Sequence, residues 1–117
     1  MDHATTFQRL QQVFILIKSH EREFPAQLAL VFFHICSHEG TYNKEIAKAL
    51  GMTSSSVSRN IKWLGPRHRL GKEGLKLVYQ THVRTYNNKT SKTLHVFLTE
   101  KGKETARLIR KIMYPHT

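Results

Sequence analysis

Apolar residues recur at helical spacing near the start of the chain. Within residues 1–22, Phe7, Leu10, Phe14 and Ile17 share one face of a predicted helix, and we expect that face to pack inward. Other apolar residues of the segment widen the face beyond what a single core contact needs. The surplus apolar surface indicates a second subunit, so this helix is a candidate dimerisation element.

Residues 43–64 carry the most informative pattern in the chain. A segment that begins at Pro25 and is apolar nearly all round precedes them, and it predicts a central, buried helix. Residues 43–64 read N-K-E-I-A-K-A-L-G-M-T-S-S-S-V-S-R-N-I-K-W-L, which predicts two short helices joined by a tight turn. Asn43 and Thr53 are the predicted N-caps, and Gly51 stands where the first helix needs a left-handed residue.

The second of these helices has an inward and an outward side on a helical wheel. Its apolar residues share the side that we expect to face the core: Val57, Ile61 and Leu64. The other positions carry hydroxyls and positive charge and are the candidate DNA-binding residues: Thr53, Ser54, Ser55, Ser56, Ser58, Arg59 and Lys62. Small side chains and free amides at the first turn favour close approach to phosphates. Arg59 suits a bidentate bond to guanine, and Lys62 suits a phosphate.

The hydrophobic period changes to two after this helix, which ends at Gly65-Pro66. Leu77 and Tyr79 alternate with Val78 and polar residues, which predicts a strand with Val78 on the opposite face. A pair of asparagines then predicts a turn, and a returning strand completes a β-hairpin over residues 75–98. The hairpin and the basic connection before it supply further candidate DNA contacts: Arg67, Arg69, Arg84, Asn88, Lys89 and Lys92.

Thr99 is the predicted N-cap of a closing helix over residues 99–113. The whole order predicts one α+β domain, mostly α, that spans residues 1–117 without a repeat or a linker. A helix-turn-helix followed directly by a basic two-stranded hairpin is typical of a winged helix-turn-helix. The hairpin tip of such a fold is placed to touch the minor groove or the DNA backbone.

Charge supports a polyanionic partner. The chain carries 19 Lys and Arg against 8 Asp and Glu, a net charge of +11, and residues 61–117 hold thirteen of the basic and three of the acidic side chains. No run approaches the roughly 18 apolar residues of a transmembrane helix, so we expect no membrane partner. A single cysteine fits a reducing compartment, and we expect a cytoplasmic, nucleoid-associated protein.

Residues 24–111 resemble the MarR-type winged-helix transcription regulators. The resemblance rests on residues 43–64 and on F-L-T-E-K-G-K-E, which follows the predicted wing. It implies a homodimer whose terminal helices form the interface and whose recognition helices enter successive major grooves of a near-palindromic site. By position it assigns eight residues to the groove or the wing: Ser54, Ser55, Ser58, Arg59, Lys62, Arg84, Lys89 and Lys92. The chain is a compact variant with little helix at either end.

Other chemistry has weaker support in the sequence. His34 and His38 have a helical spacing that suits zinc, but no third ligand accompanies them, so we expect no metal and no cofactor. Cys36 lies among apolar residues, which favours a packed thiol over a redox sensor. Histidines lie near it in the sequence, so a redox-sensing role stays an alternative. Eight scattered carboxylates, without a phosphate loop or a nucleophile elbow, predict that the chain is not an enzyme.

These patterns favour a sequence-specific regulator of transcription that binds double-stranded DNA as a dimer. One alternative is a replication, partition or packaging component of a phage or plasmid, which would build a nucleoprotein assembly through the same winged helix. Another is a module that contacts protein or RNA. Ordered multimers along repeated sites would identify the first alternative, and a lack of preference for duplex DNA would identify the second.

Overall fold

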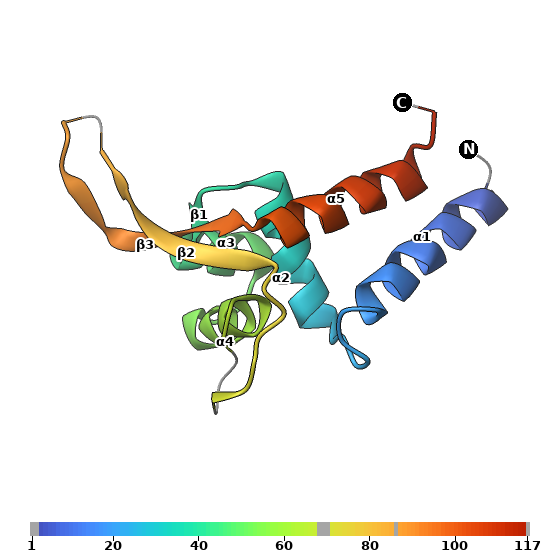
Figure 1. Cartoon of the computed structure of the whole chain (residues 1–117), viewed down its shortest axis with the longest axis horizontal. Coiled ribbons are helices and arrows are strands. Elements are labelled where there is room, and N and C mark those ends of the chain that lie inside the picture. Colours follow the sequence, from blue (N-terminus) through green and yellow to red (C-terminus); the bar gives the residue numbers. More distant parts are fainter. Residues whose placement is uncertain (1–2, 68–70, 86, 117) are drawn as a thin grey trace.

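Helices and a small antiparallel sheet follow one another along the chain (Figure 1). The computed structural model describes residues 3–67, 71–85 and 87–116. Within these ranges the elements are α1 (His3–Lys18), α2 (Ala26–Ser37), β1 (Thr41–Tyr42), α3 (Asn43–Leu50), α4 (Ser54–Leu64), β2 (Val78–Arg84), β3 (Thr90–Leu98) and α5 (Glu100–Met113). The predicted α+β class with mostly helical content is confirmed. None of the described helices has the length and apolar character needed to cross a membrane.

Helix α2 runs through the centre of the molecule, as its continuous apolar pattern predicts. Four of its apolar side chains are fully buried: Leu28, Val31, Phe32 and Ile35. They form one core with apolar residues of α4 and of the sheet, among them Ile61, Leu64 and Val96. Burial of each such side chain contributes about 1.5–3 kcal/mol, so this cluster is the main source of stability for the domain.

The sheet has the order β1-β3-β2, with antiparallel pairing throughout. The hairpin of β2 and β3 was expected, but the short strand β1 was not, because two residues are too few to show an alternating pattern. Thr41 of β1 lies opposite Val96 of β3. This pairing attaches the chain just before α3 to the hairpin, so the sheet and the two short helices form one unit.

The prediction of which residues of β2, the first strand of the hairpin, face the core is wrong. Val78 is fully buried and Tyr79 is 44% exposed, whereas the alternating pattern placed Tyr79 on the same face as the buried Leu77. Residues 75–77 do not pair in the sheet. Their amides instead bond carbonyls at the end of α4, at distances of 2.8–3.0 Å. Lys76 has a positive φ of 59°, which breaks the extended conformation and resets the alternation before β2 begins.

Helices α1 and α5 lie side by side at the end of the molecule opposite the hairpin (Figure 1). The guanidinium of Arg9 donates a hydrogen bond of 2.9 Å to the carbonyl of Met113 and joins the two helices. Val13 and Ile17 are buried, as an inward face requires. Three residues of the predicted inward stripe are instead exposed: Phe7, Leu10 and Phe14. That part of the prediction is wrong for a single copy of the chain, since α5 covers only one side of α1.

The helix ends follow the predicted capping residues with one exception. Gly51 is left-handed with φ 63°, and the hydroxyl oxygens of Thr53 and Thr99 each accept a bond of 3.1 Å from an amide in the first turn that follows. Asn43 is not an N-cap. Tyr42 occupies that position, and the Asn43 side chain reaches across to Ser54.

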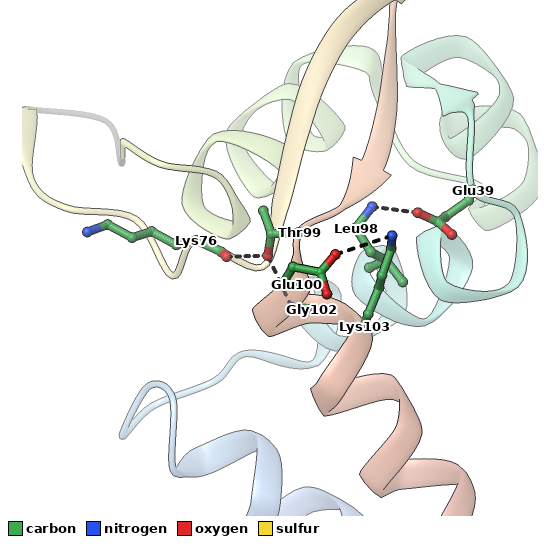
Figure 2. A network of polar contacts seen from close by, with 7 residues as sticks. All are labelled: Glu39, Lys76, Leu98, Thr99, Glu100, Gly102 and Lys103. Atoms are coloured by element: carbon green, nitrogen blue, oxygen red, sulfur yellow. Dashed lines mark hydrogen bonds and ion pairs between the residues drawn. The ribbon is translucent and has the colours of Figure 1, made fainter.

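The root of the hairpin is fixed to the start of α5 and to the turn that follows α2 (Figure 2). The hydroxyl of Thr99 donates to the carbonyl of Lys76 at 2.6 Å and accepts from the amide of Gly102. On the other side, the amide of Leu98 donates to a carboxylate oxygen of Glu39 at 2.8 Å. The hairpin therefore leaves the body of the protein from a fixed base, and its direction is set by these contacts.

Candidate nucleic-acid interface

Helix α4 is held against the body by its apolar side and by the turn that precedes it. Val57, Ile61 and Leu64 are buried, as predicted. A short turn, residues 51–53, connects α4 to α3, whose Ile46 is buried in the same core. The amide of Met52 donates to the carbonyl of Ala47 at 3.0 Å and closes the end of α3. The opposite side of α4 is left facing solvent.

The exposed side of α4 carries most of the predicted residues. Ser55, Arg59 and Lys62 are exposed, and Ser58 is partly exposed. Thr53 is exposed too, but its hydroxyl oxygen is engaged as the N-cap of the helix. Ser55, Arg59 and Lys62 therefore form the accessible centre of this surface, with one guanidinium and one ammonium group free to meet an anion.

Ser54 has a positioning contact that the sequence did not reveal. Its hydroxyl donates a bond of 2.8 Å to the side-chain oxygen of Asn43, and the Asn43 amide donates to the carbonyl of Ser54 at 3.1 Å. This reciprocal pair joins the beginnings of α3 and α4. The hydroxyl hydrogen of Ser54 is thereby used inside the protein, so the residue fixes the angle between the helices while its oxygen stays at the surface.

Ser56 does not belong to the exposed face, and its predicted place there is wrong. The residue is only 8% exposed, and its hydroxyl donates a bond of 3.1 Å to the side-chain oxygen of Gln27 in α2. Asn60 is buried beside it and donates to the Ser56 carbonyl at 2.8 Å. The side of α4 that touches α2 is thus polar. A helical wheel assigns such residues to solvent because it contains no information on the neighbouring helix.

Two grooves flank α4. One, of about 450 Å³, lies between α4 and the start of α2 and is lined by Gln27, Arg59 and Trp63 among others. The other, of about 480 Å³, lies between the end of α4 and strand β2 and is lined by Lys62, Arg67, Tyr79 and Gln80 among others. Gln27, Tyr79 and Gln80 were missed as candidates, because only the folded chain brings them beside α4.

The hairpin presents its predicted cations and Asn88 to solvent. Arg84, Asn88, Lys89 and Lys92 are all exposed. The Arg84 guanidinium donates to the side-chain oxygen of Asn88 at 2.6 Å, and Asn88 takes the left-handed conformation with φ 65°. Asn88 therefore shapes the turn and holds Arg84. Arg67 is exposed in the connection before the hairpin, and Arg69 lies outside the described residues.

Acidic side chains do not neutralise these positions. The three ion pairs found among the described residues join Lys76 to Glu73, Lys103 to Glu100 and Arg107 to Glu104. All three pairs are exposed, so water and salt screen them and they contribute little to stability. None includes a predicted DNA contact. The cations of α4 and of the hairpin remain available to phosphates.

The histidine pair and the cysteine near the end of α2 lie on different sides of the helix: His34 and His38 line a groove with α3, and Cys36 lines another with α5. The rings of His34 and His38 stack at 4.4 Å. Burial lowers the pKa of His34, His38 adds to this effect, and Glu45 opposes it. Burial also raises the pKa of the Cys36 thiol to about 12, which favours the packed thiol over a redox sensor. In the described ranges, no three His, Cys, Asp or Glu side chains come together as a metal site would require.

No model of a known protein family and no curated protein matches this chain. The resemblance to MarR-type regulators therefore rests on the residues that suggested it, and it stays a prediction.

Proposed function

We propose that this chain is a winged helix-turn-helix protein that binds double-stranded DNA with sequence preference. One observation supports this most directly: α4 presents Arg59 and Lys62 on an exposed face, next to a hairpin that presents further unpaired cations. A helix is about 10–12 Å across with its side chains, and the major groove is about 12 Å wide, so the groove admits α4. Arg59 reads a base and Lys62 contacts a phosphate.

The hairpin extends the interface in this proposal. Arg84 and Lys89 reach the minor groove or the backbone beside the site where α4 enters. Most of the affinity comes from phosphate contacts, so binding falls steeply as salt rises. We place the protein in the cytoplasm on the nucleoid, as a regulator of transcription.

A second copy of the chain completes the binding unit. Four apolar side chains of α1 are between 39% and 68% exposed: Phe7, Leu10, Phe14 and Ile15. A two-fold pair that covers this face places two α4 helices on one duplex, which suits a near-palindromic site. Ile15→Lys then converts the dimer to a monomer in sedimentation analysis. Gln12→Lys is the matched control, because it adds the same charge at an exposed polar position of α1 that points away from Phe7, Leu10 and Phe14, and it leaves the dimer intact.

Selection of bound duplexes from a random library, followed by footprinting, tests the proposed function. We expect one motif with two half-sites about one helical turn apart. Arg59→Ala relaxes the preference at one position in each half-site, at a cost of about 1–3 kcal/mol. Arg107→Ala removes the same charge from α5 and leaves the discrimination unchanged. Recovery of random sequences, or an Arg59→Ala variant that discriminates as well as the wild type, refutes the base-reading role.

A further inference from the structure

Four ring-bearing side chains lie together on the outer face of the sheet. Tyr79 of β2 is opposite Phe97 of β3, and their rings stack at 5.7 Å with an angle of 25°. Tyr42 of β1 is opposite His95 of β3, and these rings meet edge to face at 5.3 Å. We call these four residues the outer sheet face.

This face points away from the core, and Tyr79, at its edge, also lines the groove between β2 and the end of α4. The strand residues that alternate with it, Val78, Val96 and Leu98, are buried in the same core as the apolar residues of α4. Successive side chains of a strand point to opposite sides of the sheet, so the rings must face outward. A duplex bound along α4 therefore leaves Tyr42, His95 and Phe97 free, while Tyr79 lies at the border between the two surfaces.

The rings are held in place before any ligand arrives. The carbonyl of Gly40 lies 2.7 Å from a ring nitrogen of His95, and the ring of Phe97 packs over Gly40 itself. Tyr79 lies against Phe97 and is 44% exposed. Fixed rings lose little conformational freedom on binding, which favours a flat ligand that stacks on them.

A basic groove continues this face beyond Tyr42. It has a volume of about 670 Å³, and its lining includes Tyr42, His34 and the ammonium-bearing residues Lys44 and Lys48 of α3. Both lysines are exposed and belong to none of the three ion pairs of the described residues. Glu45 also lines the groove, but it accepts a hydrogen bond from Thr41 at 3.1 Å. Positive charge thus exceeds negative charge at the edge of the aromatic surface.

We propose that the outer sheet face binds single-stranded nucleic acid. Unpaired bases stack on aromatic side chains whatever their sequence, and lysines beside the rings hold the backbone phosphates. Tyr79 and Tyr42 supply the stacking surfaces, and Lys44 and Lys48 supply the phosphate contacts. This activity goes beyond duplex binding by α4 and also uses Tyr42, Lys44 and Lys48, which are not predicted duplex contacts, so variants of the two lysines separate one activity from the other.

Fluorescence anisotropy with labelled oligo(dT) and oligo(U) of about ten nucleotides tests this inference, since single-strand sites span roughly 4–16 nucleotides. The two probes separate DNA from RNA as the strand that is bound. We expect Tyr79→Ala to weaken binding about tenfold, as loss of one stacked base predicts, and Tyr79→Phe to restore it. Tyr114→Ala is the matched control, since Tyr114 is 58% exposed but stands after α5 at the other end of the molecule.

Two further measurements keep the outcomes distinct. Thermal melting by circular dichroism checks that each variant folds. The double variant Lys44→Ala with Lys48→Ala tests the phosphate contacts separately and leaves the rings intact. Those lysine variants must reduce the salt dependence of single-strand binding. The inference is overturned if the wild type binds neither probe while it still binds duplex DNA. The inference is also overturned if the Tyr79→Ala variant binds both probes as tightly as the wild type, or if the only effect of the substitution is to dissociate a dimer.

Discussion

Replacing Gly102 with alanine places a methyl group in the tightest contact between α5 and the root of the hairpin. A Cβ atom at this position lies 2.0 Å from the carbonyl oxygen of Leu77 and 3.2 Å from a methyl group of Leu98. Ordinary van der Waals contact begins at 3.4 Å, so the first turn of α5 has to move by about 1.4 Å. The clash involves backbone, which a change of side-chain rotamer does not relieve.

The cost follows from the hydrogen bonds that this movement stretches. The amide of Thr99 donates to Leu77 at 3.0 Å, its hydroxyl donates to Lys76 at 2.6 Å, and the amide of Gly102 donates to Thr99 at 3.1 Å. At about 1 kcal/mol each, their loss costs about 3 kcal/mol. The higher helix propensity of alanine offsets about 1 kcal/mol of this loss of stability. We therefore expect Gly102→Ala to lower the free energy of unfolding by about 2 kcal/mol.

Urea denaturation followed by circular dichroism measures this change, and the melting temperature should fall by about 8 °C at roughly 4 °C per kcal/mol. Lys111→Ala is the matched control, because Lys111 is exposed on the last turn of α5, belongs to none of the three ion pairs of the described residues, and its replacement changes stability by less than about 0.5 kcal/mol. A Gly102→Ala variant as stable as the wild type, or more stable, would show that the contact with Leu77 relaxes easily. The argument for a fixed hairpin root would then fail.

Three other predictions test the interface and the core. Lys89→Ala should weaken binding to all duplexes alike and reduce the slope of affinity against salt by about one, whereas Lys111→Ala on the last turn of α5 leaves that slope unchanged. Thr53→Ala removes the N-cap of α4 and should lower the free energy of unfolding by about 1 kcal/mol in urea titrations; an unchanged midpoint would show that the cap contributes nothing. Cys36 should react with iodoacetamide at pH 8 roughly a thousandfold more slowly in the native protein than in urea, because the pKa of its thiol is raised from 9.0 to about 12 in the fold. The unfolded chain loses this proton first, so the free energy of unfolding should fall as the pH rises from 9 towards 12.

Local signals in the sequence identified the helices and most of their ends. Gly51, Thr53 and Thr99 were predicted correctly because a cap is a contact between residues that are close in the chain. The exposed positions of Arg59 and Lys62 were also predicted correctly, since the apolar residues of α4 define its inner side. These predictions needed no information about other elements.

The wrong predictions share a different origin. Asn43 pairs with Ser54, and Ser56 pairs with Gln27, so each polar side chain is used by a partner from another element. The phase of β2 was wrong because residues 75–77 bond the end of α4 before the strand begins. A sequence pattern shows how polar a residue is, but the partner that forms its hydrogen bond is determined only when the chain folds.

The bond between Arg9 and the carbonyl of Met113 has a practical consequence for work on this protein. It brings the start of α1 and the end of α5 together at one end of the molecule, opposite the hairpin (Figure 1). Fluorescent dyes or fused proteins attached near either helix end therefore sit far from α4. A short peptide that links the end of α5 of one copy to α1 of a second copy would tether two copies in one polypeptide. With such a tandem, α4 of one copy can be altered while α4 of the other copy stays unchanged.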